Sequence, residues 1–148
     1  MDDALDDYRR VMQINPDLAE SFFRMGELFL RRSQIDEAID AFRICGTKNP
    51  KYPRMHLRLG DAFFQKGLQE MGLRYYQAAV VDDDKDVEAR LRLANALHAM
   101  GKFCDAREAL EAARDLETDT SRRDTILDLI KKVDPDCKKQ GKTPAKRR

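Results

Sequence analysis

Few residues of this chain have the types and spacing that chemistry requires. The two histidines, His56 and His98, have no cysteine or carboxylate at the spacing of metal ligands or of a catalytic set. The three cysteines, Cys45, Cys104 and Cys137, form no CxxC pair, and an odd number without a framework predicts reduced thiols. The seven glycines form neither a GxGxxG nor a P-loop pattern, and the acidic run VVDDDKD lacks EF-hand spacing. The sequence therefore predicts no enzyme, no cofactor and no metal site.

Charge is unevenly distributed along the 148 residues. The formal net charge is +1, yet residues 131–148 carry eight Lys or Arg and two Asp, which leaves residues 1–130 with a net charge of −5. A nucleic-acid binder needs a basic face with aromatic side chains, so the acidic body argues against one. No apolar run reaches the length of a membrane span, and the acidic start MDDALDDYRR is unlike a signal peptide. Together with reduced thiols, these features predict a nuclear or cytoplasmic protein that does not contact membranes.

One pattern of nine residues occurs three times at an interval of 34 residues. The chain reads FFRMGELFL, then HLRLGDAFF, then RLRLANALH. Large apolar residues at i and i+4 beside a small residue predict a helix against which another helix packs closely. A second set of small, large and small positions follows each time: Ala38, Gly72 and Ala106; Phe42, Tyr76 and Leu110; Cys45, Ala79 and Ala113. Because Ser33, Gly67 and Gly101 lie between the two sets, we expect a tight turn there, and hence an all-α protein of paired helices.

These columns resemble the tetratricopeptide repeat, whose period is 34 residues. The segment Ala19–Tyr52 fits its signature at Phe22, Met25, Gly26, Phe29, Ala38, Phe42 and Pro50. The resemblance implies a right-handed α-solenoid of antiparallel helix pairs, with a leading half repeat and a C-terminal capping helix. The predicted solenoid, 2–133, consists of the half repeat 2–16, the repeats 19–52, 53–86 and 87–119, and the capping helix 121–133. A disordered basic tail is predicted over 134–148.

The resemblance also implies a binding surface on the concave face, which the first helix of each repeat lines. Carried over column by column, the predicted groove residues are Phe23, Glu27, Leu30, Leu57, Asp61, Phe64, Leu91, Asn95 and His98. A solvated surface seldom carries five large apolar side chains in one strip, so we expect an apolar or amphipathic partner segment, helical or extended, in this groove. The carboxylates of the groove favour a basic partner. The alternative is that neighbouring helices or another segment of the chain already cover these side chains.

The basic end of the chain has three interpretations, which the sequence leaves open. In the first, KKQGKTPAKRR is a nuclear-import signal, which it resembles. In the second, its positive charge contacts nucleic-acid phosphates. In the third, it keeps the protein in solution. Its basic residues are Lys138, Lys139, Lys142, Lys146, Arg147 and Arg148. The first interpretation slightly favours the nucleus over the cytoplasm.

The predicted function is a non-catalytic scaffold for protein–protein interaction. A weaker resemblance, which includes the basic tail and is strongest over DVEARLRLA, is to the repeat subunit of transcription factor IIIC, which implies a place in a nuclear transcription assembly. Adaptors of cell-cycle, ciliary or co-chaperone complexes are alternatives, as is nucleic-acid contact through the tail. A clamp for the carboxylate of a heat-shock protein needs Lys, Asn and Arg in the groove, and acids stand there instead. The oligomeric state is not predicted.

Overall fold

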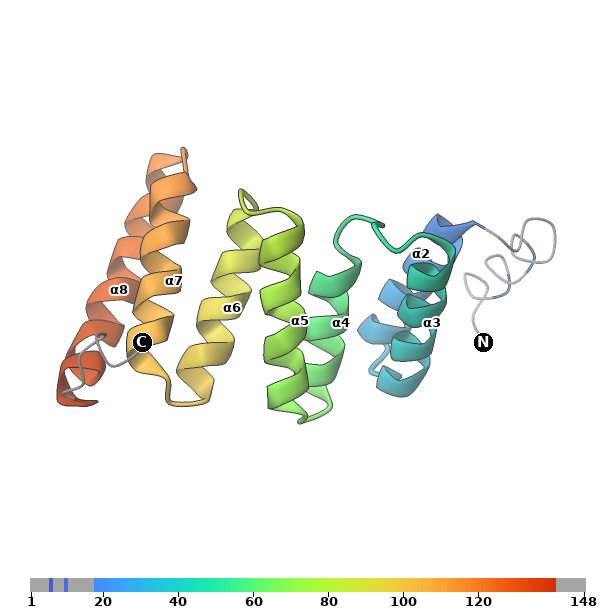
Figure 1. Cartoon of the computed structure of the whole chain (residues 1–148), viewed down its shortest axis with the longest axis horizontal. Coiled ribbons are helices and arrows are strands. Elements are labelled where there is room, and N and C mark those ends of the chain that lie inside the picture. Colours follow the sequence, from blue (N-terminus) through green and yellow to red (C-terminus); the bar gives the residue numbers. More distant parts are fainter. Residues whose placement is uncertain (1–5, 7–9, 11–17, 141–148) are drawn as a thin grey trace. The chain divides into compact units, whose positions relative to one another are not determined.

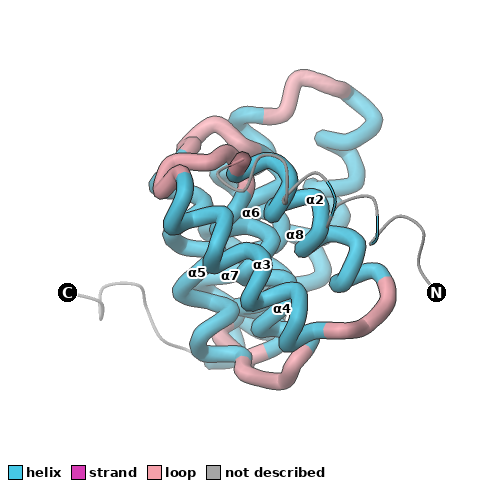
Figure 2. Tube along the Cα trace, turned by 90° about the vertical axis from the view of Figure 1, so that its right-hand side faces the viewer, coloured by secondary structure: helices cyan, strands magenta, loops and turns pink. Residues whose placement is uncertain are grey.

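The computed structural model describes Asp6, Arg10 and residues 18–140 of the chain. These residues form helices and loops, and none of them lies in a strand (Figures 1 and 2). The helices are α2 (Ala19–Arg31), α3 (Ile35–Lys48), α4 (Met55–Gln65), α5 (Gln69–Asp82), α6 (Val87–Ala99), α7 (Phe103–Leu116) and α8 (Thr120–Gln140). The predicted all-α fold of paired helices is confirmed. None of the described helices has both the length and the apolar character needed to cross a bilayer.

Two compact units divide the chain between Asp82 and Asp83, at the end of α5. In the first unit α2 packs on α3, α4 packs on α5, and α3 also contacts α4. In the second unit α7 packs against both α6 and α8. The first two predicted repeats, 19–52 and 53–86, correspond to the pairs α2–α3 and α4–α5, and the third corresponds to α6–α7.

The turn inside each helix pair contains one residue in the left-handed region of backbone space. Its φ angle is +62° at Ser33, +92° at Gly67 and +78° at Gly101. After each of these residues the next amide turns back to the last turn of the helix, with N···O distances of 2.8–2.9 Å: Gln34 to Phe29, Leu68 to Phe63, and Lys102 to Leu97. This arrangement satisfies carbonyl groups that a helix end leaves unpaired, and it favours glycine at the left-handed position.

Glycines inside the first helices receive aromatic rings from the second helices. A Cβ atom added to Gly26 would lie 2.6 Å from the ring of Phe42, and one added to Gly60 would lie 2.6 Å from the ring of Tyr76. Such distances are too short for carbon atoms, so only glycine leaves room for these rings. Glycine costs a helix about 1 kcal/mol relative to alanine, and the close packing of the aromatic ring offsets this cost.

The last helix is longer than the sequence indicates. The capping helix was expected over 121–133, with a disordered tail from 134, but α8 continues to Gln140 through Pro135. Proline normally ends a helix, so contacts with neighbouring residues must hold the final turns in place. The predicted half repeat 2–16, apart from Asp6 and Arg10, and the tail 141–148 lie outside the described residues.

Candidate functional site

Two of the predicted groove residues belong to the core of the first unit. Phe23 is 8% exposed and Leu57 is 1% exposed, so neither side chain offers an open apolar surface. The ring of Phe23 packs 5.6 Å from that of Phe42 and 4.9 Å from that of Tyr52, measured between centroids. The expectation that these two side chains contact a partner is therefore corrected, because residues of the chain itself already cover them.

The predicted acidic groove residues are committed to hydrogen bonds within the first unit. Asp61 is buried, and its carboxylate accepts a hydrogen bond of 2.6 Å from the hydroxyl of Tyr76 and one of 3.0 Å from the guanidinium of Arg58. The same guanidinium donates a bond of 3.2 Å to Glu27 on α2. These carboxylates are thus neutralised across α2, α4 and α5, which counters the expectation that they favour a basic partner. Leu30 and Phe64 remain partly accessible.

Replacing Tyr76 by phenylalanine is expected to destabilise the first unit by about 1–3 kcal/mol. The change removes the hydroxyl and leaves one oxygen of buried Asp61 without that donor, which costs more than the loss of an exposed hydrogen bond. Urea unfolding measures the effect. Tyr75→Phe is the matched control, since Tyr75 lies half-buried with its ring stacked 5.2 Å from Phe63. Equal losses in the two variants would contradict the buried network.

The second unit contains a cleft between α6 and α8, with α7 as its floor. Its volume is about 110 Å³, and it is lined by Ala94, Asn95, His98, Leu110, Leu129, Lys132 and Val133. Asn95 and His98 are predicted groove residues that the structure brings together here. Leu91, the third from this repeat, is half-buried and does not line the cleft. The repeat columns of the sequence did not predict the lining residues on α8, because that helix lacks the columns from which the groove was deduced.

The cleft combines an apolar interior with polar groups at its rim. Alanine, leucine and valine side chains make up the interior, whereas Asn95, His98 and Lys132 are exposed. The imidazole of His98 meets the ring of Phe103 edge-on, with 5.3 Å between centroids. Lys132 forms no ion pair with any residue in the described part of the chain, and no carboxylate is among the lining residues. Hydrogen-bond donors therefore surround an apolar cavity, which favours a ligand that is apolar and bears an acceptor.

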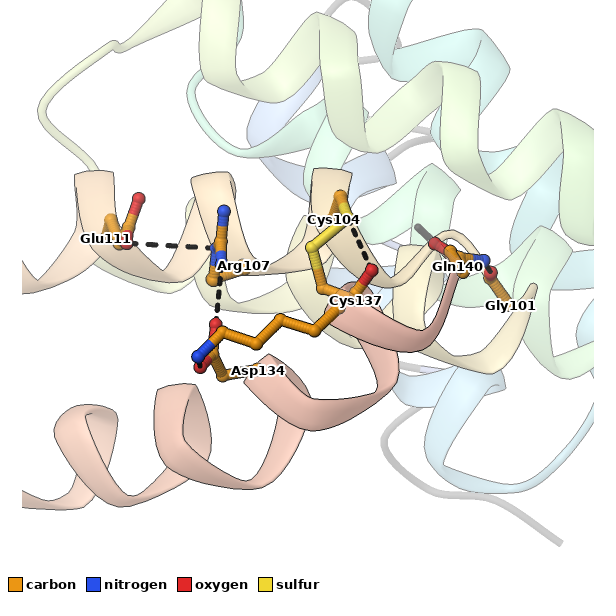
Figure 3. The surroundings of a disulfide bond; sticks show 8 residues. Gly101, Cys104, Arg107, Glu111, Asp134, Cys137 and Gln140 are labelled. Carbon is orange, nitrogen blue, oxygen red and sulfur yellow. Dashed lines mark hydrogen bonds and ion pairs between the residues drawn. A yellow bond between two sulfur atoms is a disulfide. The ribbon is translucent and has the colours of Figure 1, made fainter. Parts of the chain in front are cut away.

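The expectation of three reduced thiols is wrong for two of them. Cys104 on α7 and Cys137 on α8 form a disulfide, and their Cα atoms lie 4.6 Å apart, within the range of natural disulfides (Figure 3). The remaining thiol, Cys45, is fully buried, and burial raises its pKa to about 11. Because only the thiolate is nucleophilic, Cys45 is inert at neutral pH.

The other candidates for chemistry have structural roles. His56 on α4 pairs with the carboxylate of Asp82 at 2.5 Å and stacks against Tyr75. The acidic run spans the last residues of α5 and the connection to α6, where the Asp86 carboxylate accepts a hydrogen bond of 3.2 Å from the amide of Ala89 and caps α6. Within residues 18–140, no three His, Cys, Asp or Glu side chains gather as metal ligands. Of the predicted basic tail, Lys138 and Lys139 lie exposed on the last turn of α8.

Comparison with known proteins finds a family profile that matches part of the chain and solved structures whose fold is similar to most of it. A sequence profile of the tetratricopeptide repeat matches residues 23–86. No curated protein matches the chain. Nothing in these comparisons supports the weaker resemblance to the subunit of transcription factor IIIC.

Solved structures with similar folds share about a fifth of their residues with this chain. YrrB, described as a TPR protein with an unusual peptide-binding site, is 20% identical with a TM-score of 0.66; the match covers 76% of this chain but only 58% of YrrB. MamA is 18% identical with a TM-score of 0.73, over 94% of this chain and 90% of MamA. The first TPR domain of Spaghetti (RPAP3), bound to the HSP90 peptide SRMEEVD, is 19% identical with a TM-score of 0.70, over 79% and 90%. Likeness at this level of identity shows a shared fold.

Proposed function

We propose that this chain is a non-catalytic scaffold that binds a protein partner, since residues 23–86 match the profile of the tetratricopeptide repeat and solved structures with similar folds include proteins of that repeat. The cleft of the second unit is the binding site in this proposal. The observation that carries it is an apolar cavity ringed by Asn95, His98 and Lys132, with donors that the described residues leave available. Two similar structures have peptide ligands or a peptide-binding site in their descriptions, which supports the same class of function.

The chemistry of the cleft defines the proposed partner. A cavity of about 110 Å³ has room for one apolar side chain such as leucine, and it does not hold a drug-sized ligand. A carboxylate next to that side chain in the partner would face the ammonium group of Lys132. The proposed ligand is therefore a helical or extended segment with an apolar residue flanked by acids. This replaces the basic partner expected from Glu27 and Asp61, which are already paired.

A short synthetic peptide with leucine between glutamates tests this proposal, and the same peptide with lysines in place of the glutamates is its control. Titration followed by nuclear magnetic resonance is expected to shift the amides of Asn95, His98 and Lys132 with the acidic peptide. Lys132→Glu is expected to weaken binding about five-fold, because reversing a rim charge changes the binding free energy by about 1 kcal/mol.

Lys139→Glu is the matched variant, since it makes the same change of charge on the same helix but lies outside the cleft lining. It is expected to alter the affinity less than two-fold at the same ionic strength. Equal weakening by both variants would indicate attraction to the general charge of α8. Peptide-induced shifts confined to the first unit would refute the cleft as the binding site.

Location in the nucleus or cytoplasm, and membership of a nuclear transcription assembly, belong to the same proposal. Both depend on the basic end of the chain, of which Lys138 and Lys139 are described and exposed. A protein partner held in the cleft is consistent with either compartment, as it is with the cell-cycle, ciliary and co-chaperone adaptors.

A further inference from the structure

The final turns of α8 are held by the preceding helix pair. Pro135 has no N–H group, so it cannot donate to the carbonyl of Lys131, and its ring crowds that carbonyl. The residue before a proline also avoids helical backbone angles. Nevertheless α8 runs on to Gln140. The stretch after Pro135 must therefore gain its order from contacts outside the helix.

Three contacts at equal spacing connect the end of α8 to α7 and to the turn before it; the first comes from Asp134, just before the proline, and the other two come from residues after it (Figure 3). Asp134 pairs with Arg107 at 2.5 Å, Cys137 is bonded to Cys104, and the side-chain amide of Gln140 donates a hydrogen bond of 2.7 Å to the carbonyl of Gly101. From one contact to the next, the residue on α8 advances by three positions in the sequence. Its partner, on α7 or in the turn before α7, moves back by three positions. Helices that run antiparallel bring such positions together, since residues three apart share one face.

The disulfide is the strongest of the three contacts. The side chains of Arg107 and Asp134 are 26% and 28% exposed, and Gln140 is exposed, so water competes for both polar contacts. Hydrogen bonds from Lys138 and then Arg107 hold the pKa of the Asp134 carboxyl below its usual value, so the ion pair stays charged to a lower pH than that of a free aspartate. Cys137 is buried at 5% exposure and its link is covalent. Without that link, the solvated hydrogen bond of Gln140 remains to hold the residues after Pro135, and the Arg107–Asp134 pair holds only the residue before it.

The held stretch begins next to the cleft. Ile126, Val133 and Cys137 are the buried residues of α8, so Cys137 lies one helical turn after Val133 on the same face. Val133 and its neighbour Lys132 line the cleft. A helix end that unwinds back to Pro135 would leave these two residues in the last turn of the helix, where backbone hydrogen bonds fray.

We propose that the Cys104–Cys137 disulfide is a redox clasp that regulates the cleft, an inference that rests on the proposed function of that cleft. A thiol of the glutathione class is the reductant. Its thiolate attacks the half-buried sulfur of Cys104, the S–S bond breaks, and Cys137 leaves as a thiolate that takes up a proton. A second thiol releases the first as R–S–S–R and leaves Cys104 as a thiol. In total, two R–SH supply two electrons and two protons.

The reduced chain loses the order of residues 136–140 and loosens the wall that Lys132 and Val133 provide. In compartments where glutathione keeps thiols reduced, the clasp is open at rest and closes on oxidation. In oxidising compartments it is closed. The cleft thus binds its partner more tightly in the oxidised protein, because its wall is already in place when the partner arrives.

Hydrogen exchange of the full chain, followed by mass spectrometry with and without a phosphine reductant, tests this proposal. Reduction is expected to speed amide exchange at least ten-fold over 136–140 and several-fold over 129–133, and to leave the first unit unchanged. Cys104→Ser/Cys137→Ser is expected to exchange like the reduced protein with or without reductant. Over 129–140, Cys45→Ser is expected to exchange as the unmodified chain does, since Cys45 lies in the first unit.

Two results would overturn the clasp. One is identical exchange over 136–140 in both redox states; the other is faster exchange there with no change over 129–133, which would separate the disulfide from the cleft.

Circular dichroism checks that the double serine variant is folded, and the reduced natural chain provides the same comparison without any substitution. The acidic leucine peptide is expected to bind the reduced chain about five-fold more weakly. Failure of the peptide to bind either form refutes the proposed function, while the exchange data still decide on the clasp.

Discussion

Replacing Phe42 by alanine is expected to lower the free energy of unfolding of the first unit by about 3–5 kcal/mol. Phe42 is fully buried, and its ring fills the space that Gly26 leaves open on α2. It also packs against Phe23, one of the buried residues of the same core cluster. Removal of the ring leaves a cavity between two helices that cannot close fully, so the loss exceeds the transfer free energy of the side chain.

Tyrosine fluorescence during urea unfolding measures this loss selectively. The chain has no tryptophan, and its four tyrosines, Tyr8, Tyr52, Tyr75 and Tyr76, all precede the division between the two units. Ile44→Ala is the control, because Ile44 lies on the same helix and is 38% exposed. That variant is expected to lose less than about 1 kcal/mol. Similar losses for the two substitutions would show that Phe42 does not fill the space beside Gly26.

Removal of the disulfide by Cys104→Ser/Cys137→Ser is expected to lower the stability of the second unit by about 2–4 kcal/mol. The two cysteines are 33 residues apart, and closing a loop of that length restricts the unfolded chain by this amount. The loop contains most of α7 and α8, and α6 of the same unit packs on α7, so the restriction acts directly on two helices and through α7 on the third. Far-UV circular dichroism follows the unfolding of helices in both units.

Tyrosine fluorescence is the internal control for the disulfide. Because the second unit contains no tyrosine, the fluorescence transition in urea is expected to stay where it is while part of the circular dichroism transition moves to lower urea. Treatment of the natural chain with a reductant is expected to reproduce this shift. A fluorescence transition that moves equally would show that the two units unfold together, and an unmoved circular dichroism transition would contradict the stabilising role of the disulfide.

The helix pairs could be predicted from the sequence because their packing recurs. The pairs Gly26–Phe42 and Gly60–Tyr76 recur at the interval of the repeat. In each pair the aromatic ring packs against the glycine that precedes it in the sequence. Ser33, Gly67 and Gly101 recur in the same way and all adopt positive φ angles. Because the same residue types recur at one interval, the positions that need a glycine, an aromatic ring or a turn residue can be recognised in the sequence.

The candidate site was less predictable because it depends on contacts that do not recur. Phe23 is predicted to face an open surface, but Tyr52, in the connection before α4, packs against its ring. Asp61 is expected from the repeat columns to favour a basic partner, whereas Tyr76 and Arg58, both in the second repeat, already bond to its carboxylate. Residues of α8 were missed altogether, since that helix has no repeat columns. A family pattern thus locates the surface of the first helices but does not show what lies over it.

The equal spacing of the contacts between α7 and α8 restricts how this region can change its length. Inserting or deleting one residue inside either helix rotates everything beyond it by about 100°, which moves Asp134, Cys137 and Gln140 together away from Arg107, Cys104 and Gly101. The connection between the helices, at Glu117–Asp119, is where an insertion leaves both faces aligned. Variation in chain length here is therefore confined to the loop, while substitutions on the outer faces of the two helices remain open.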